Sequence, residues 1–239
     1  MKSFELMHFQ NSRALAQSAA LAWLGEVEKS DRARKPYCIA LSGGRITQEF
    51  YAAVVEMAGP QATSFGSVHF FWADERCVPP SDPQSNYRLA SELLFEPLHI
   101  SETHIHRVRG EGSPAAAAAT EELRRLASSV QNGLPVLDLV LLGLGEDGHV
   151  ASLFPGEPPA KSANQPVYCA VANSPKPPPN RVTLNYPVLA AARKVWMLAS
   201  GAGKEAALRD SLSPSGTTPF ARVLQSRNDT RIFTDIHVS

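Results

Sequence analysis

The chain has 239 residues, and its 23 lysines and arginines balance 23 aspartates and glutamates, so the formal net charge is zero. Proteins that hold nucleic acid or an anionic membrane surface by charge normally carry a basic excess, so this balance argues against both kinds of partner. Hydrophobic residues make up 44% of the chain and charged residues 19%, which is typical of a folded globular protein and excludes a disordered one.

Cysteine usage and apolar runs indicate the cellular compartment of the protein. Cys38, Cys77 and Cys169 are far apart and odd in number, so we expect neither a disulfide framework nor a Cys-x-x-Cys zinc or redox motif. No stretch approaches the roughly 18 apolar residues of a membrane span, and the first residues do not form a secretory signal. We expect a cytoplasmic protein in which residues 1–239 form one domain. The oligomeric state stays open, with a monomer as the default expectation.

Apolar periodicity predicts helices and strands in alternation. Helices are expected over residues 12–29, 47–57, 86–95, 114–130 and 204–212, and strands over 37–41, 68–72, 136–142, 195–199 and 232–236. Asn11 or Ser12 should cap the first helix, Gly59-Pro60 should close the second, and Ser113 with Pro114 should begin the fourth. Strands separated by helix-length segments favour a Rossmann-like α/β fold, with a doubly wound, mainly parallel sheet covered by helices on both faces.

Ligand sites in such sheets lie beyond the carboxyl ends of the strands, so the loops there are the first to inspect. Ser42-Gly43-Gly44 follows the strand over 37–41 and leads into a helix. Adjacent glycines let backbone N–H groups approach an anion at a helix N-terminus, and Arg45 adds a positive charge. On its own, an ordinary strand-to-helix turn explains this loop equally well.

A charged segment follows the next strand. Asp74, Glu75 and Arg76 come directly after an apolar run that ends at Trp72. Out of context they would form a solvated surface cluster, but their position directs them towards the same crevice as the glycine loop. The sequence does not decide which of the three faces a ligand. Ser85-Asn86, further along, is interpreted as a helix cap.

The third loop, residues 143–155, contains an acidic pair and a histidine among glycines. We expect a helical turn to begin at His149, and an imidazole at a helix N-terminus stays neutral at pH 7, as a general base must be. Asp147 would accept a hydrogen bond from one ring nitrogen and leave the other free to take a proton. The alternative is a purely structural histidine.

Two later segments bring cations to strand ends. Arg181 and Lys204, with the glycine loop, suggest a preformed phosphate pocket, although both could be ordinary surface residues. His99, His104 and His106 lack helical ligand spacing and a carboxylate in register, so no metal site is expected there.

Taken in order, these motifs resemble the 6-phosphogluconolactonase family from about residue 36 to 210. They are LSGG, FWADER followed by SN, GLGEDGHVASLFP, RVTL and GAGK. The related glucosamine-6-phosphate deaminases have a glutamate where this chain has Phe154, and that glutamate works with the histidine in ring opening. The family's glycine loop usually continues Ser-Thr-Pro, whereas here Arg45-Ile46-Thr47 follows, which replaces hydroxyl groups with a charge.

The resemblance implies hydrolysis of 6-phospho-D-glucono-1,5-lactone in the oxidative pentose phosphate pathway, without a metal or organic cofactor. Catalysis would fall to His149 as base, Asp147 as its orienting partner and Arg76 as oxyanion donor. The substrate would be bound by Ser42, Gly43, Gly44, Arg45, Asp74, Arg181 and Lys204. Two alternatives stay open: a sugar-phosphate isomerase or deaminase, and a non-catalytic sugar-phosphate sensor coupled to transcription. Phe154 argues against the first, and the roughly 35 residues before the first predicted strand are too few for a DNA-binding module.

Overall fold

The computed structural model describes residues 4–61, 63–156 and 166–238. Six strands form its central sheet: β1 (Phe4–His8), β2 (Tyr37–Leu41), β3 (Val68–Trp72), β7 (Leu139–Gly143), β10 (Lys194–Ala199) and β11 (Thr230–Thr234). Their order is β1-β11-β10-β7-β2-β3, and every pairing is parallel. The central strands are buried along nearly their whole length, because helices cover both faces of the sheet.

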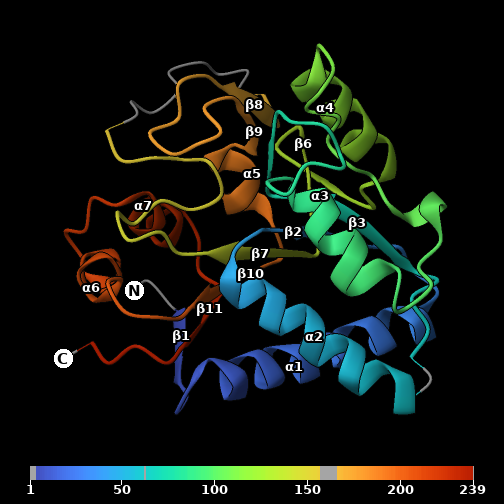
Figure 1. Ribbon diagram of the computed structural model, residues 1–239, viewed down its shortest axis with the longest axis horizontal. Coiled ribbons are helices and arrows are strands. Elements are labelled where there is room, and N and C mark those ends of the chain that lie inside the picture. Colours follow the sequence, from blue (N-terminus) through green and yellow to red (C-terminus); the bar gives the residue numbers. More distant parts are fainter. Residues whose placement is uncertain (1–3, 62, 157–165, 239) are drawn as a thin grey trace.

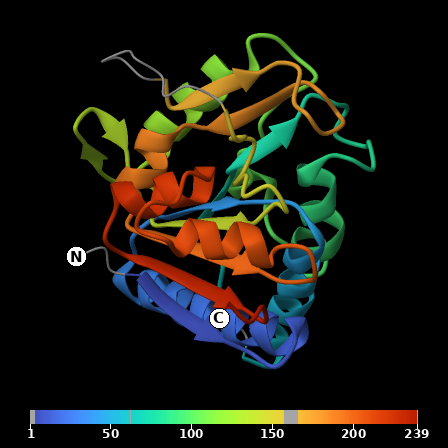
Figure 2. The same cartoon turned by 90° about the vertical axis from the view of Figure 1, so that its left-hand side faces the viewer.

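The helices lie on the two faces of this sheet as the alternating pattern predicts (Figures 1 and 2). On one side are α1 (Ser12–Ala33), α2 (Arg45–Gln61) and α3 (Asn86–Ala90), which continues as a π-helical turn over Ser91–Phe95; on the other are α5 (Tyr186–Ala191), α6 (Glu205–Leu212) and α7 (Pro219–Ser226). Trp23 of α1 is fully buried against the rings of Phe50 and Phe70. The doubly wound α/β fold is therefore confirmed.

A second, antiparallel sheet was not predicted. It has the order β4-β9-β8 and consists of β4 (Asp74–Arg76), β9 (Arg181–Leu184) and β8 (Tyr168–Val171). Helix α4 (Ala115–Leu126) packs against it, and the short hairpin of β5 (Val130–Gln131) and β6 (Leu134–Pro135) follows α4. Ala73 links the two sheets, since its N–H donates to Leu41 O and its carbonyl accepts from Leu184 N, both at 2.7 Å. This sheet therefore places the charges of β4 and β9 beside the end of β2.

Several predicted boundaries differ from the structure. Asn11 caps α1 through a 2.9 Å bond from Ala14 N, as expected. Gly59-Pro60 does not close the second helix, because α2 packs along α1 and continues to Gln61. Ser113 does not cap α4, which begins at Ala115 with no side-chain cap. Of the part of the chain that the structure describes, no helix combines the length and apolar character needed to cross a membrane.

The chain reverses its winding direction between β2 and β7. From β2 it proceeds to β3 on one side, and from β7 it proceeds to β10 and β11 on the other. A sheet of this kind opens a crevice at the carboxyl ends of the two strands where the order reverses. Ser42 Oγ donates to Leu141 O at 2.7 Å and ties the two strand ends together.

Three histidines lie beside the edge strand β3. His106 Nδ1 bonds Glu122 Oε1 at 2.8 Å and His106 Nε2 bonds His69 Nδ1 at 3.0 Å, while His104 Nδ1 bonds Val68 O. Burial, together with the neighbouring charges of His106, His104 and Arg125, lowers the pKa of His69 to about 4 against the opposing effect of Glu122. Within the described residues, no group of three or more His, Cys, Asp or Glu side chains is arranged to hold a metal ion.

These histidines make stability depend on pH. Unfolded His69 titrates near 6.5 and folded His69 near 4, so the unfolded chain binds more protons as pH falls between those values. We expect the free energy of unfolding, measured in urea, to fall as pH drops through this window, and to fall less steeply in His69→Gln. The exposed His237→Gln is the matched control and should keep the wild-type slope. Equal slopes in His69→Gln and wild type would contradict this assignment.

Candidate functional site

A cavity of about 160 Å³ opens at the carboxyl ends of β2 and β7. Its wall includes nine of the ten predicted site residues: Ser42, Gly43, Gly44, Arg45, Asp74, Arg76, His149, Arg181 and Lys204. The tenth, Asp147, is hydrogen-bonded to the ring of His149. Loops and strands that are far apart in the sequence therefore meet at this one position, as the fold predicts.

The glycine loop contributes backbone rather than side chains. Gly44 has a φ of +107°, and α2 begins at the next residue, so the first N–H groups of this helix have no partner within the helix. A Cβ atom on Gly43 would lie 2.0 Å from Asn86 Oδ1, so only glycine fits. The hydroxyl of Ser42 is already engaged by Leu141 O. The loop thus offers a partly positive helix N-terminus to the cavity.

Strand alternation separates the three charges of β4. Asp74 and Arg76 line the cavity, while Glu75 points to the opposite face. There its carboxylate accepts from Asn86 N at 2.8 Å and Tyr87 N at 2.7 Å, and so caps the start of α3. Glu75 therefore has a structural role, which answers the question that the sequence left open.

Asp74 is the centre of a buried polar network. Its Oδ2 accepts from Ser152 Oγ at 2.6 Å and lies 3.9 Å from a guanidinium nitrogen of Arg181, and Asn86 Nδ2 donates to its backbone carbonyl at 2.8 Å. Arg76 donates through Nη1 to Gln84 O, and its Nε is buried without a hydrogen-bond partner, 4.0 Å from Asp74 Oδ2. Sequence reasoning missed Ser152, although it lies within the GEDGHVASLFP motif.

The Asp147–His149 pair is formed by a tight glycine turn. Asp147 Oδ1 lies 2.5 Å from His149 Nδ1, and Gly145 N donates to His149 O at 2.9 Å. A Cβ atom on Gly145 would lie 2.0 Å from His149 Nδ1, so this residue must be glycine for the pair to fit. The expected helical turn at His149 is wrong: Val150 and Leu153 instead close a short turn by a β-bridge.

Burial, and not a helix N-terminus, keeps His149 neutral. Desolvation lowers the pKa of His149, the carboxylate of Asp147 opposes that shift, and the charge of Lys176 reinforces it. The centre of the Phe154 ring lies 4.8 Å from the centre of the imidazole, and this contact contributes to the burial of His149. Burial alone would raise the pKa of Asp147, but its bonds to His149 and the nearby Lys176 lower it overall. The resting pair is therefore a carboxylate and a neutral imidazole.

Two cations flank the mouth of the cavity. Arg45 is exposed at the start of α2, and Lys204 directly precedes α6. Burial lowers the pKa of Lys204, and the positive charge of Arg45 lowers it further. The two cations are therefore close enough to repel each other. An anion with two negative charges would relieve this repulsion.

Arg181 is more deeply placed than the sequence suggests. Its side chain is only 4% exposed, and its guanidinium donates to the carbonyls of Lys176, Pro177 and Pro178, each at 3.0 Å, and to Ser152 Oγ at 3.3 Å. Arg181 thus adds positive charge to the cavity wall while its N–H groups hold the loop that precedes β9.

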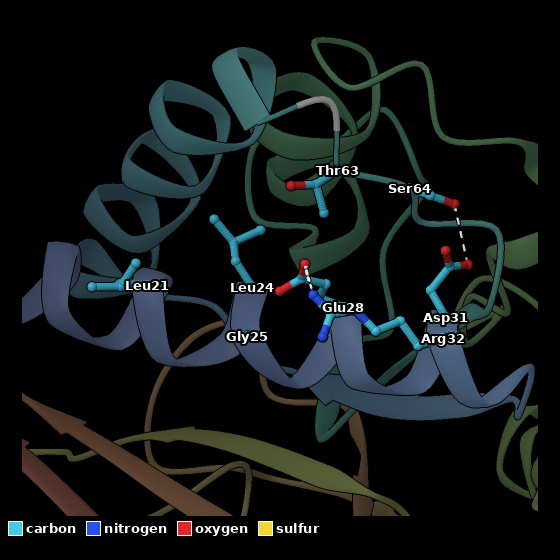
Figure 3. A pocket seen from close by; sticks show the side chains of 8 residues that line it. All are labelled: Leu21, Leu24, Gly25, Glu28, Asp31, Arg32, Thr63 and Ser64. Carbon is cyan, nitrogen blue, oxygen red and sulfur yellow. Dashed lines mark hydrogen bonds and ion pairs between the residues drawn. The ribbon is translucent and has the colours of Figure 1, made fainter.

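A larger hollow of about 620 Å³ lies away from these strand ends, beside α1 (Figure 3). The charged groups in its wall have partners nearby: Arg32 donates to Glu28 Oε1 at 2.5 Å, and the Ser64 hydroxyl donates to Asp31 Oδ1 at 3.3 Å. It has no titratable pair like Asp147–His149. The smaller cavity is therefore the candidate site, because chemical groups converge there.

Comparison with known proteins agrees with this architecture. Residues 10–232 match the model of the family described as glucosamine-6-phosphate isomerases/6-phosphogluconolactonase. A 6-phosphogluconolactonase of Streptomyces coelicolor is 32% identical over 220 residues, covering 89% of this chain and 84% of that protein. One of Treponema pallidum is 34% identical over 218 residues, with coverages of 90% and 85%.

A solved structure is also similar to this chain along nearly its whole length. The 6-phosphogluconolactonase of Trypanosoma brucei superposes with a TM-score of 0.87 at 27% identity, covering 98% of this chain and 97% of that chain. Because the family match spans nearly the whole sequence and the relatives match over most of their own length, the chain belongs to the glucosamine-6-phosphate isomerase/6-phosphogluconolactonase family.

Proposed function

We propose that this protein hydrolyses 6-phospho-D-glucono-1,5-lactone to 6-phospho-D-gluconate, a step of the oxidative pentose phosphate pathway. One observation carries the proposal: a carboxylate-bound, neutral imidazole faces the same small cavity as two cations and a helix N-terminus. Such a cavity suits a substrate with a reactive ester at one end and a phosphate at the other. The names of the relatives support the same activity.

The phosphate is bound at the side of the cavity formed by the glycine loop. Backbone N–H groups at the start of α2 donate to its oxygens, and Arg45 and Lys204 neutralise its charge. Arg181 adds to the attraction from the wall. The binding energy gained at the phosphate holds the distant lactone carbonyl in an orientation that faces His149.

His149 activates water for attack on the lactone. Its Nδ1–H donates to Asp147, so its Nε2 carries the lone pair and accepts a proton from water as the oxygen adds to the carbonyl carbon. The resulting imidazolium is stabilised by the carboxylate of Asp147. The carbonyl oxygen becomes an oxyanion, and the guanidinium of Arg76, which lines the cavity, donates to it.

The tetrahedral intermediate then breaks down by the reverse proton movement. The bond between the carbonyl carbon and the ring oxygen breaks, and His149 returns its proton to that oxygen. The products are the ring-opened hydroxyl and a carboxylic acid, which ionises at neutral pH. Each atom of the added water is thus accounted for: His149 carries one proton to the ring oxygen, and the carboxylic acid releases the other to solvent.

Phe154 favours hydrolysis over aldose–ketose isomerisation. Its ring packs against His149 and lies below the Arg181 guanidinium, with 5.6 Å from Arg181 Cζ to the ring centre. Isomerisation needs a second acid–base group beside the imidazole, and a hydrocarbon ring supplies none. Release of ammonia from an amino-sugar phosphate would instead establish the deaminase alternative.

Replacing the base should nearly abolish catalysis. In His149→Gln we expect kcat to fall by roughly 10²–10⁴, the range expected for loss of a general base, with an unchanged circular dichroism spectrum. Acid release from freshly prepared lactone at controlled pH measures this, after subtraction of spontaneous hydrolysis. The exposed His99→Gln serves as control and should retain full activity. Near wild-type turnover in His149→Gln would exclude it as the base.

Removing a phosphate ligand should affect phosphorylated substrate selectively. In Lys204→Met we expect kcat/KM for the phosphorylated lactone to fall roughly 10- to 100-fold, since a hydrogen bond to a charged group is lost. Glucono-1,5-lactone, which has no phosphate, should be hydrolysed at nearly the wild-type rate. The exposed Lys35→Met controls for loss of a positive charge elsewhere. Equal losses for both substrates would argue against phosphate binding by Lys204.

A further inference from the structure

A proline-rich loop that the mechanism does not use lies against the site. In this loop, Ser174 N donates to Pro179 O at 2.8 Å, and Ser174 Oγ contacts both the carbonyl of Lys176 at 3.0 Å and its N–H at 3.3 Å. Prolines on both sides of Lys176 restrict the backbone further. The main chain at Lys176 is therefore held in one place.

Arg181 completes this restraint from inside the protein. Its Nε and Nη2 donate to the carbonyls of three consecutive residues, 176 to 178, and its Nη1 donates to Ser152 Oγ. Nearly full burial of this side chain leaves it little freedom to move. The guanidinium thus connects the loop to the buried network around Asp74.

From this fixed base, the Lys176 side chain extends towards the Asp147–His149 pair. Its Nζ lies 3.8 Å from Asp147 Oδ1, the same oxygen that bonds the imidazole. The side chain is 42% exposed, so it lies at the surface beside the pair and not within the core. An ammonium group here counters the negative charge that Asp147 brings to the pair.

The charges around His149 come from three separate elements. Asp147 lies in the same loop as His149, Asp74 acts on His149 from β4, and Lys176 acts on it from the loop before β9. The two carboxylates favour the charged imidazole, whereas Lys176 disfavours it. Arg76 and Arg181 also line the cavity, and the guanidinium of Arg181 lies over the Phe154 ring. Lys176 is the cation whose ammonium lies beside the Asp147 oxygen that bonds the imidazole.

We propose that Lys176 is a positioning residue of this site: its ammonium anchors the Asp147 carboxylate that holds His149, and Arg181 sets its place by clamping the loop. The inference rests on the proposed lactonase activity for its kinetic consequence. Its electrostatic consequence belongs to the resting protein and does not require turnover.

The test compares Lys176→Met with wild type between about pH 5 and pH 8. Without the ammonium, the pKa of His149 rises, so kcat/KM should begin to fall at a higher pH than in wild type. Below that pKa the loss should be roughly two- to fivefold, the effect of removing one partly solvated charge near the pair. At the high-pH plateau the variant should stay within about twofold of wild type.

Three further variants separate charge from shape and position. Lys176→Arg keeps the charge and should restore the wild-type acid limb. Lys29→Met removes an exposed lysine from an ion pair on α1 and should leave the profile unchanged. Arg181→Lys loosens the clamp and should shift the acid limb in the same direction as Lys176→Met. Combining the two should add no further shift, because Arg181 acts through Lys176.

A titration of the His149 ring by NMR in the substrate-free protein gives a second readout. Coincident titrations of His149 in Lys176→Met and wild type would overturn the role of Lys176, and so would failure of Lys176→Arg to restore the profile. A full Arg181→Lys shift on the Lys176→Met background would overturn the clamp. A shifted titration in a protein that does not hydrolyse the lactone would refute the proposed function while supporting the electrostatic coupling.

Discussion

The hydrogen bond between Asp147 and His149 is the interaction on which the site depends. It exists only because Gly145 lacks a side chain, since a Cβ atom there would overlap the imidazole nitrogen and the carboxylate. The bond selects the tautomer of the ring and leaves the opposite nitrogen for the cavity. Phe154 and the surrounding burial then hold the ring neutral at the pH where a general base must work.

The fold supplies what surrounds this pair. The reversal of strand order between β2 and β7 puts a helix N-terminus beside the glycine turn, and the bond from Ser42 to Leu141 fixes the spacing of the two strand ends. The small antiparallel sheet then adds Asp74, Arg76 and Arg181 from the side. In the proposed reaction, anion binding and proton transfer use different elements that meet at one opening.

Local patterns were sufficient to predict five of the six parallel strands and the site loops, but not the edge strand β1. The strands over 37–41 and 68–72 coincide with the observed ones, because short apolar runs bounded by turn residues are unambiguous. The pairing of β4 with β9 could not be predicted, since it joins residues more than a hundred positions apart, both strands are short, and every residue of β4 is charged. The same pairing decides that Glu75 faces away and that the donors of Arg181 hold a loop, so these roles became visible only in three dimensions.

The protonation state of the His149 ring in the resting protein can be measured directly by ¹⁵N NMR of its side chain. At neutral pH we expect a proton on Nδ1, a bare Nε2, and a titration midpoint below the ordinary histidine value. A proton on Nε2, or a ring that is still charged at neutral pH, would contradict it.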